Sequence, residues 1–240
     1  MPGQTMGVSA FTEHLIKSLG ISRSELALAY MLGTLTSSFI LPYAGKVYDK
    51  VGARVMAFAA SVGMGLTLVI LSFSDRFTVG LSSFSVIVVM FFGFLMLRFW
   101  GQGVLTLSCR NMLVKWFEHK RGLVTGLSGP IVALGFSATP LALNYFITKQ
   151  GWQNTWLILG IISIVGFSLL VLVFFRDNPE DCGLLPDGVH ADAAATKKES
   201  IAIRQYTASE AKRTFPFWII GLSHIRHPFT LISQVLLASI

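Results

Sequence analysis

Ionisable side chains occur at two places inside otherwise uncharged apolar stretches of this 240-residue chain. Arg98 stands alone in the first stretch, and His224, Arg226 and His227 stand together in the second. A charge inside an apolar helix is costly, and such residues are rare unless they serve a binding site or an ion pathway. No Asp or Glu accompanies either group. A carboxylate pairs bidentately with Arg, so these cations favour an anionic ligand.

The depth of both groups agrees with a buried binding site. Arg98 precedes Cys109 by eleven residues, so at about 1.5 Å per residue it lies ~16 Å from the end of its helix, near the middle of an apolar layer of ~30 Å. His224 lies nine residues beyond Phe215, which gives a similar depth. Two structural explanations stay open. Backbone carbonyls or water between packed helices would satisfy Arg98, and a kink at Pro228 would let the second group reach the membrane surface.

The histidines and acidic residues do not form a metal site of a known type. His224 and His227 are three residues apart and could both bind a metal, but no Cys or acid joins them. A neutral His at this position could instead carry a coupling proton near pH 7. Four carboxylates lie in RDNPEDCGLLPDG (176–188), yet their spacing does not fit a calcium loop and two prolines restrict wrapping. No nucleophile, base and orienting residue form a set. We therefore expect no metal, no cofactor and no enzyme activity, with a membrane-embedded enzyme as a less favoured alternative.

Long apolar helices must position these residues. Hydrophobic residues make up 53% of the chain and charged residues 13%, about half the charged fraction usual in soluble domains. Glycines and prolines inside the apolar runs are tolerated in membrane helices. Charge-free runs cover 26–45, 55–74, 77–97, 122–148 and 150–175, each near or above the ~20 residues that cross a bilayer. The sequence predicts an all-α, polytopic membrane helical bundle, with spans at about 26–45, 55–74, 79–109, 122–147 and 153–175.

Positive charges fall mainly on one side of this predicted bundle. If the loop 46–54 is cytosolic, the alternation of spans places 110–121 and 176–214 on the same side, which collects thirteen Lys and Arg against four outside. Cytosolic loops are enriched in Lys and Arg, so we predict that 46–54 and 176–214 are cytoplasmic in a multi-pass protein of the cell membrane, the inner membrane in a bacterium. The net charge of +7 then requires no nucleic-acid partner. Cys109 and Cys182 are expected to be unpaired on this side.

The chain divides into three predicted segments: a helical bundle at 1–175, a cytosolic loop at 176–214, and a seventh helix at 215–240. The loop is rich in Asp, Ala and Lys, which is typical of a flexible tether. The first nineteen residues provide only a partial span at about 1–12 before a polar outer loop, half of what a crossing requires. They also lack the basic start of a signal peptide. We therefore expect the chain to begin partway through its first helix.

Four segments resemble the major facilitator superfamily of secondary transporters. GKVYDKVGAR at 45–54 resembles the signature turn G-x-x-x-D-K-x-G-x-R between the second and third helices of that superfamily. WFEHKRG at 116–122 and RDNPEDCGLLPDG at 176–188 resemble W-F-x-x-K-R-G and R-x-x-P-E-x-x-G-L-x-P-D-G in its monocarboxylate and oxalate:formate branch. PGQTMGVSAF at 2–11 is similar to helix 1 of the same branch. The family has twelve helices, and this chain resembles the N-terminal half plus helix 7.

The resemblance implies which residues bind substrate and which gate access. Helices 1, 4, 7 and 10 line the central cavity in this superfamily. The signature turn helps to hold the cytosolic gate against the other half. We interpret its glycines as points of close helix approach, and its acid as one favoured by a helix N-terminus. The implied substrate-binding residues are Gln4, Thr5, Arg98, Gln102, His224, Arg226 and His227, and the implied gating residues are Gly45, Asp49, Gly52 and Arg54.

Together, the unpaired cations and the resemblance predict secondary active transport of a small organic anion, either a monocarboxylate or a small dicarboxylate, by alternating access. The coupling is antiport or proton symport, so the expected partners are the anion, the lipid bilayer, and a coupling proton or counter-anion. Two alternatives remain: a truncated fragment or membrane sensor that does not transport, and a major facilitator for a different solute.

Overall fold

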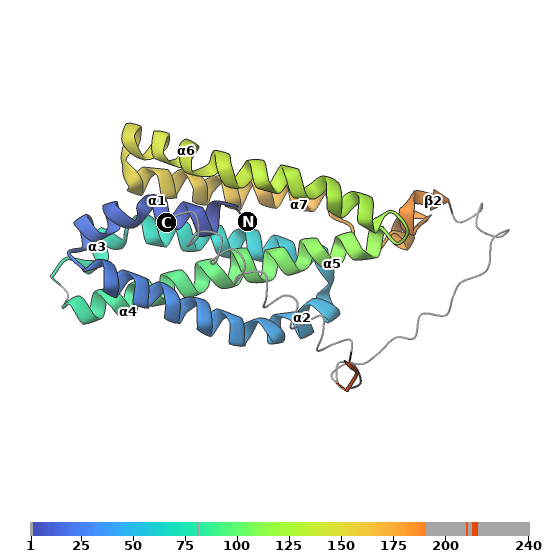
Figure 1. The fold of residues 1–240 in the computed structure, drawn as a ribbon, viewed down its shortest axis with the longest axis horizontal. Helices are drawn as coiled ribbons and strands as arrows, with labels where there is room; N and C mark the ends of the chain where they lie inside the picture. Colours follow the sequence, from blue (N-terminus) through green and yellow to red (C-terminus); the bar gives the residue numbers. More distant parts are fainter. Residues whose placement is uncertain (1, 81, 191–209, 211–212, 216–240) are drawn as a thin grey trace, which may run out of the picture. The chain divides into compact units, whose positions relative to one another are not determined.

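The computed structural model describes residues 2–80, 82–190, 210 and 213–215. The chain divides into two units, Met1–Ala194 and Ala195–Ile240, and the helices discussed below belong to the first (Figure 1). The predicted seventh helix lies outside the described residues apart from Phe215, and the candidates His224, Arg226 and His227 lie outside them too.

The helix α2 (Arg23–Ser72) consists of two arms that fold back on each other at Gly52 (Figure 1). Ser22 begins the first arm with a capping box: its hydroxyl accepts from the Glu25 amide, while the Glu25 carboxylate accepts from the Ser22 amide. These paired bonds satisfy amides that have no partner within the helix. Gly52 has φ 84° and ψ 175°, a conformation essentially confined to glycine, so the chain reverses there.

A second rod follows the short helix α3 (Ser74–Thr78). It consists of α4 (Ser83–Leu97), the π-helix η1 (Arg98–Leu105) and α5 (Thr106–Trp116). The dihedrals of Arg98 and Thr106 at the two junctions are helical. The three pieces therefore run as one continuous helix (Figure 1).

A third stretch is again a folded-back pair. α6 (Arg121–Ile161) breaks at Gly151, where φ is 83°, and continues through η2 (Ile162–Phe167) into α7 (Ser168–Phe174). The segment that follows contains η3 (Glu180–Cys182), β1 (Leu184–Leu185), η4 (Pro186–Gly188) and β2 (Val189–His190), with β1 and β2 antiparallel. The prediction of a flexible tether from 176 onward is therefore wrong for 176–190, which are folded against the bundle by contacts described below.

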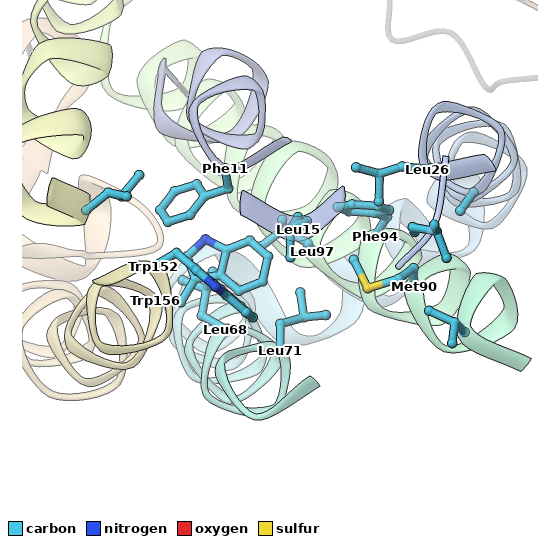
Figure 2. Close-up of a cluster of buried hydrophobic side chains, with 14 of the residues drawn as sticks. Phe11, Leu15, Leu26, Leu68, Leu71, Met90, Phe94, Leu97, Trp152 and Trp156 are labelled. Carbon is cyan, nitrogen blue, oxygen red and sulfur yellow. The ribbon is translucent and has the colours of Figure 1, made fainter. Parts of the chain in front are cut away.

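The core joins α1 (Pro2–Leu19) to the other helices (Figure 2). Phe11 and Leu15 are fully buried, and the Phe11 ring centre lies 4.9 Å from that of Trp156. Trp152 packs edge-on against Trp156, with ring centres 5.5 Å apart. The polar outer loop expected after residue 12 is wrong for 13–19, which are helical. The helix continues to Leu19, and Phe11 and Leu15, one turn apart, both pack into the core.

Three helical stretches among the described residues are long and apolar enough to cross a membrane: Arg23–Ser72, Ser83–Trp116 and Arg121–Phe174. Their outer surfaces carry large apolar side chains that are more than 70% exposed in the chain alone, including Phe39, Phe84, Leu141 and Phe174. Exposed apolar patches of this kind mark membrane or protein contacts. The predicted all-α membrane bundle is confirmed, while the individual crossing bounds stay predictions.

Candidate functional site

Arg98 is held by two side chains of the first arm of α2. Its Nε donates a hydrogen bond of 3.1 Å to Oγ1 of Thr34. Its guanidinium carbon lies 4.7 Å from the centre of the Tyr30 ring, within the range of a cation–π interaction. Tyr30 and Thr34 are four residues apart on a helix and share one face. The arginine is therefore fixed both at its Nε and over one face of its plane.

A glycine brings the two helices close enough for these contacts. Gly33 is buried, and a Cβ atom at this position would lie 2.9 Å from the backbone nitrogen of Leu95. Only a residue without a side chain fits there. Because Gly33 precedes Thr34, its close approach to α4 brings the Thr34 hydroxyl within reach of Arg98 three residues beyond Leu95.

Two cavities meet at Arg98. The first, which we call the hydroxyl cavity, has a volume of about 240 Å³, and the second, the aromatic cavity, about 370 Å³. The hydroxyl cavity is lined by Thr34, Ser37, Ser38, Leu41, Arg98, Gln102 and Gly103. The aromatic cavity is lined by Val8, Ser9, Thr12, Arg23, Leu26, Ala27, Tyr30, Phe94 and Arg98. Arg98 thus lines both cavities, and each also contains hydroxyl-bearing side chains.

Arg98 has no carboxylate partner in the part of the chain that the structure describes. The single ion pair found there joins Arg23 to Glu13, and both side chains are mostly exposed. Neutral groups, a hydroxyl and an aromatic ring, hold Arg98 instead. Within the described residues its positive charge is therefore uncompensated, so an oxyanion in either cavity would meet an unneutralised cation.

The signature turn lies at one end of the bundle, where 45–54, 115–121 and 176–188 meet. We call this region the basic end. The Asp177 carboxylate accepts a hydrogen bond of 2.8 Å from the Arg54 amide, and its Oδ1 lies 2.6 Å from where a Cβ of Gly52 would stand. The Arg54 side chain donates to the Leu172 carbonyl. Asp177 therefore caps the second arm of α2 and ties it to the end of α7.

This geometry corrects two interpretations of the signature turn. A Cβ at Gly45 would meet nothing within 4 Å among the described residues, so no close helix approach explains that glycine. Asp49 is exposed and lies in the last turn of the first arm of α2, where a helix dipole disfavours an acid. The acid at the helix N-terminus is Asp177, because the fold brings 176–188 back to this turn. The gating roles of Gly45, Asp49, Gly52 and Arg54 stay predictions.

A second carboxylate caps the start of α6. Asp187 accepts hydrogen bonds from the backbone amides of His119 at 2.8 Å, Lys120 at 3.1 Å and Glu118 at 3.3 Å. The bond from the His119 amide is the main reason that the pKa of Asp187 lies below its ordinary value. Asp187 itself has φ 67°, a conformation that is uncommon outside glycine but in which Asp is enriched. The short β1–β2 hairpin holds it in place.

Further polar contacts close the basic end. The Lys115 ammonium donates to Oδ1 of Asn178 at 3.1 Å, and Nε1 of Trp116 donates to the Arg176 carbonyl at 3.2 Å. The Tyr48 hydroxyl, buried in the same region, has no hydrogen-bond partner among the described residues. Bonds from α5, from the loop before α6 and from the second arm of α2 therefore all end on 176–188.

The sequence model of the Major Facilitator Superfamily matches residues 2–238. The chain belongs to this superfamily. It is thus a multi-pass membrane protein from a family of transporters rather than enzymes.

Three curated relatives of this superfamily member are also named as transporters, at low sequence identity. The probable sulfoacetate transporter of Cupriavidus necator is 22% identical over 89% of this chain and 45% of its own length. The glycerol-3-phosphate transporter of Bacillus subtilis is 24% identical over 74% of this chain and 38% of its own length. An uncharacterised transporter of the same superfamily from Escherichia coli is 23% identical over 89% and 48%, respectively. The chain spans about half the length of the curated relatives it matches.

The structure brings together only some of the substrate-binding residues expected for a major facilitator. Arg98 and Gln102 line the same cavity, as their spacing suggests. Gln4 and Thr5 lie in the first turns of α1, and the helix 7 candidates lie outside the described residues. Their roles in substrate binding remain predictions.

Sequence reasoning missed the partners of Arg98 and the local helix type. Tyr30 and Thr34 lie on the first arm of α2, outside the helices that were assigned to the cavity. The π-helix η1 was also not expected. Such helices are rare and occur often at functional sites. The sequence signal that could have indicated it is the glycine pair around Gln102, at positions 101 and 103, in the middle of an apolar helix.

Proposed function

We propose that this chain forms part of a secondary active transporter for a small organic anion, and that Arg98 binds the anion. The observation that carries the proposal is the uncompensated guanidinium of Arg98, which borders two cavities and has no carboxylate partner among the described residues. A carboxylate pairs well with arginine because the guanidinium fork matches its two oxygens. Transport would proceed by alternating access, in which helical repeats rock about a central site.

The named relatives support an oxyanion substrate. One is described as a probable sulfoacetate transporter and another as a glycerol-3-phosphate transporter. Sulfoacetate and glycerol 3-phosphate are both small organic anions. Within this class we propose a monocarboxylate or a small dicarboxylate, as in the monocarboxylate and oxalate:formate branch that WFEHKRG and RDNPEDCGLLPDG resemble. The coupling is either exchange for a second anion or symport with a proton.

The proposed orientation places the basic end in the cytoplasm of a cell-membrane protein. The segments 46–54, 110–121 and 176–214 carry thirteen Lys and Arg, against four at the opposite ends of the predicted spans, and segments rich in Lys and Arg stay on the cytosolic side. Because Asp177 and Asp187 tie 176–188 to this end of the bundle, the first part of the long loop and the signature turn lie on the same side of the membrane.

Uptake measurements test the proposed role of Arg98. Radiolabelled oxalate, formate and lactate are offered to proteoliposomes that contain the protein expressed from its own gene. Arg98→Ala should abolish uptake of the transported anion. Arg110→Ala is the matched control, because Arg110 is exposed on the same helical rod at α5 and lines neither cavity, and it should transport like wild type. Unchanged uptake by Arg98→Ala would remove Arg98 from the site.

A further inference from the structure

Thr34 uses both its proton and a lone pair in the contacts around Arg98. Its Oγ1 donates to the Tyr30 carbonyl at 2.8 Å and accepts from Nε of Arg98 at 3.1 Å. The hydroxyl proton is committed to the helix backbone, so the oxygen must present a lone pair to the arginine. This relay runs from Arg98 through Thr34 to the backbone of α2, and it fixes the hydroxyl in the accepting orientation.

The relay determines which edge of the guanidinium is free. A guanidinium can bind a carboxylate side-on, through Nε and one terminal nitrogen, or end-on, through its two terminal nitrogens. The bond to Thr34 occupies Nε and closes the side-on edge. The Tyr30 ring covers one face of the plane. An anion is left with the end-on edge, where both terminal nitrogens can donate.

We infer that Thr34 is a positioning residue for the substrate: it acts through Arg98, holding the guanidinium so that a small anion binds end-on. Tyr30 assists by supporting the plane of the guanidinium. The inference rests on the proposed function, because it assumes that Arg98 binds the anion. It adds that the first arm of α2, and not only the helix that carries Arg98, sets the affinity of the site.

Three substitutions at Thr34 separate its hydrogen bond from its volume. Thr34→Val keeps a similar shape but removes the acceptor, and Thr34→Cys replaces it with a thiol, which is a weak acceptor. Thr34→Ser keeps the hydroxyl. In the uptake assay described above, Thr34→Val and Thr34→Cys should raise the KM of the transported anion by about tenfold, because a hydrogen bond to a charged group is lost, with Vmax nearly unchanged. Thr34→Ser should stay within about twofold of wild type.

Thr36→Val is the matched control. Thr36 lies on the same arm, is half-buried, and also donates its hydroxyl to a backbone carbonyl four residues earlier, that of Leu32 at 2.9 Å. It lines neither cavity at Arg98, so its KM should match wild type. Thr34→Cys provides the test if Thr34→Val does not fold, as judged by size-exclusion chromatography.

The outcomes distinguish this inference from the proposed function. A raised KM for Thr34→Val or Thr34→Cys, with normal values for Thr34→Ser and Thr36→Val, supports positioning by Thr34. A wild-type KM for both Thr34→Val and Thr34→Cys, alongside loss of uptake in Arg98→Ala, overturns the inference and leaves the proposed function intact. Equal defects in Thr34→Val, Thr34→Cys and Thr34→Ser also overturn it, since volume rather than the hydrogen bond would then be responsible. Normal uptake by Arg98→Ala overturns both.

Discussion

Replacing Gly52 by alanine should destabilise the bundle at the turn between the two arms of α2. Gly52 has φ 84° and ψ 175°, and a Cβ atom there would stand 2.6 Å from Oδ1 of Asp177. The new methyl group would therefore face two penalties: an unfavourable backbone conformation and a collision with the carboxylate that caps the second arm.

The size of each penalty follows from the geometry. A non-glycine residue in this region of the φ/ψ map costs about 1–3 kcal/mol. Moving Asp177 away to relieve the collision would break its bond to the Arg54 amide. A hydrogen bond to a charged group contributes about 1.5–3 kcal/mol, and the partial exposure of Asp177 points to the lower value. We expect Gly52→Ala to lose at least about 2 kcal/mol, or about 4–8 °C in melting temperature for a chain of this size.

Thermal unfolding of the purified protein in detergent, followed by tryptophan fluorescence, measures the effect. Gly45→Ala is the matched control from the same motif, because Gly45 is helical and a Cβ there meets nothing within 4 Å. It should be neutral or slightly stabilising, since alanine favours a helix over glycine by up to about 1 kcal/mol. Asp177→Ala should cause a smaller loss than Gly52→Ala. Equal melting temperatures for the Gly52 and Gly45 variants would refute the account of this turn.

Three more predictions concern helix packing, the acidic cap and the exposed thiol. Gly160→Ala should lower the melting temperature, because its Cβ would lie 2.8 Å from a Val69 methyl and 2.9 Å from a backbone carbonyl; Gly126→Ala, with open space around it, should not, and similar melting temperatures would contradict this. The pKa of Asp187 is lowered from 3.8, so its stabilisation is complete above that pH and disappears as the pH falls below it towards the folded-state pKa; the melting-temperature gap between wild type and Asp187→Asn should shrink over this window, and a constant gap would count against the cap. Cys182 is exposed, so a membrane-impermeant maleimide should label it only in permeabilised cells if the basic end is cytoplasmic; labelling in intact cells would reverse the orientation.

The sequence was sufficient to predict the helical bundle and the position of Arg98. Uncharged runs of about twenty residues leave few alternatives to membrane helices, and one arginine inside such a run is conspicuous without any structure. Gln102 followed from the same argument, because it lies four residues further along the same helix. These features depend on local composition, which the sequence displays directly.

The residues that hold Arg98 could not be predicted in the same way. Thr34 reaches Arg98 because Gly33 allows α2 to approach the backbone of Leu95. That contact depends on how two helices pack. Nothing in the local pattern around Thr34 distinguishes it from Thr36, which lines neither cavity at Arg98.

The acidic caps at the basic end were missed for a related reason. Asp177 and Asp187 stand in a polar, proline-containing segment, which alone is typical of a tether. Their importance arises from amides more than sixty residues away, at Arg54 and at 118–120. The segments WFEHKRG and RDNPEDCGLLPDG were identified as two separate motifs. In the structure Asp187 of the second accepts hydrogen bonds from backbone amides of the first, at 118–120, so the two motifs pack together.

Equilibrium binding tests the central claim, that Arg98 binds the transported anion, more directly than transport does. Isothermal titration calorimetry of the purified protein with oxalate, formate and lactate gives the dissociation constant without requiring the transport cycle. The account predicts saturable binding of at least one anion to wild type and to Arg110→Ala, and a dissociation constant at least about tenfold higher for Arg98→Ala, since a charge-assisted pairing is lost. The same dissociation constant in all three proteins would contradict it.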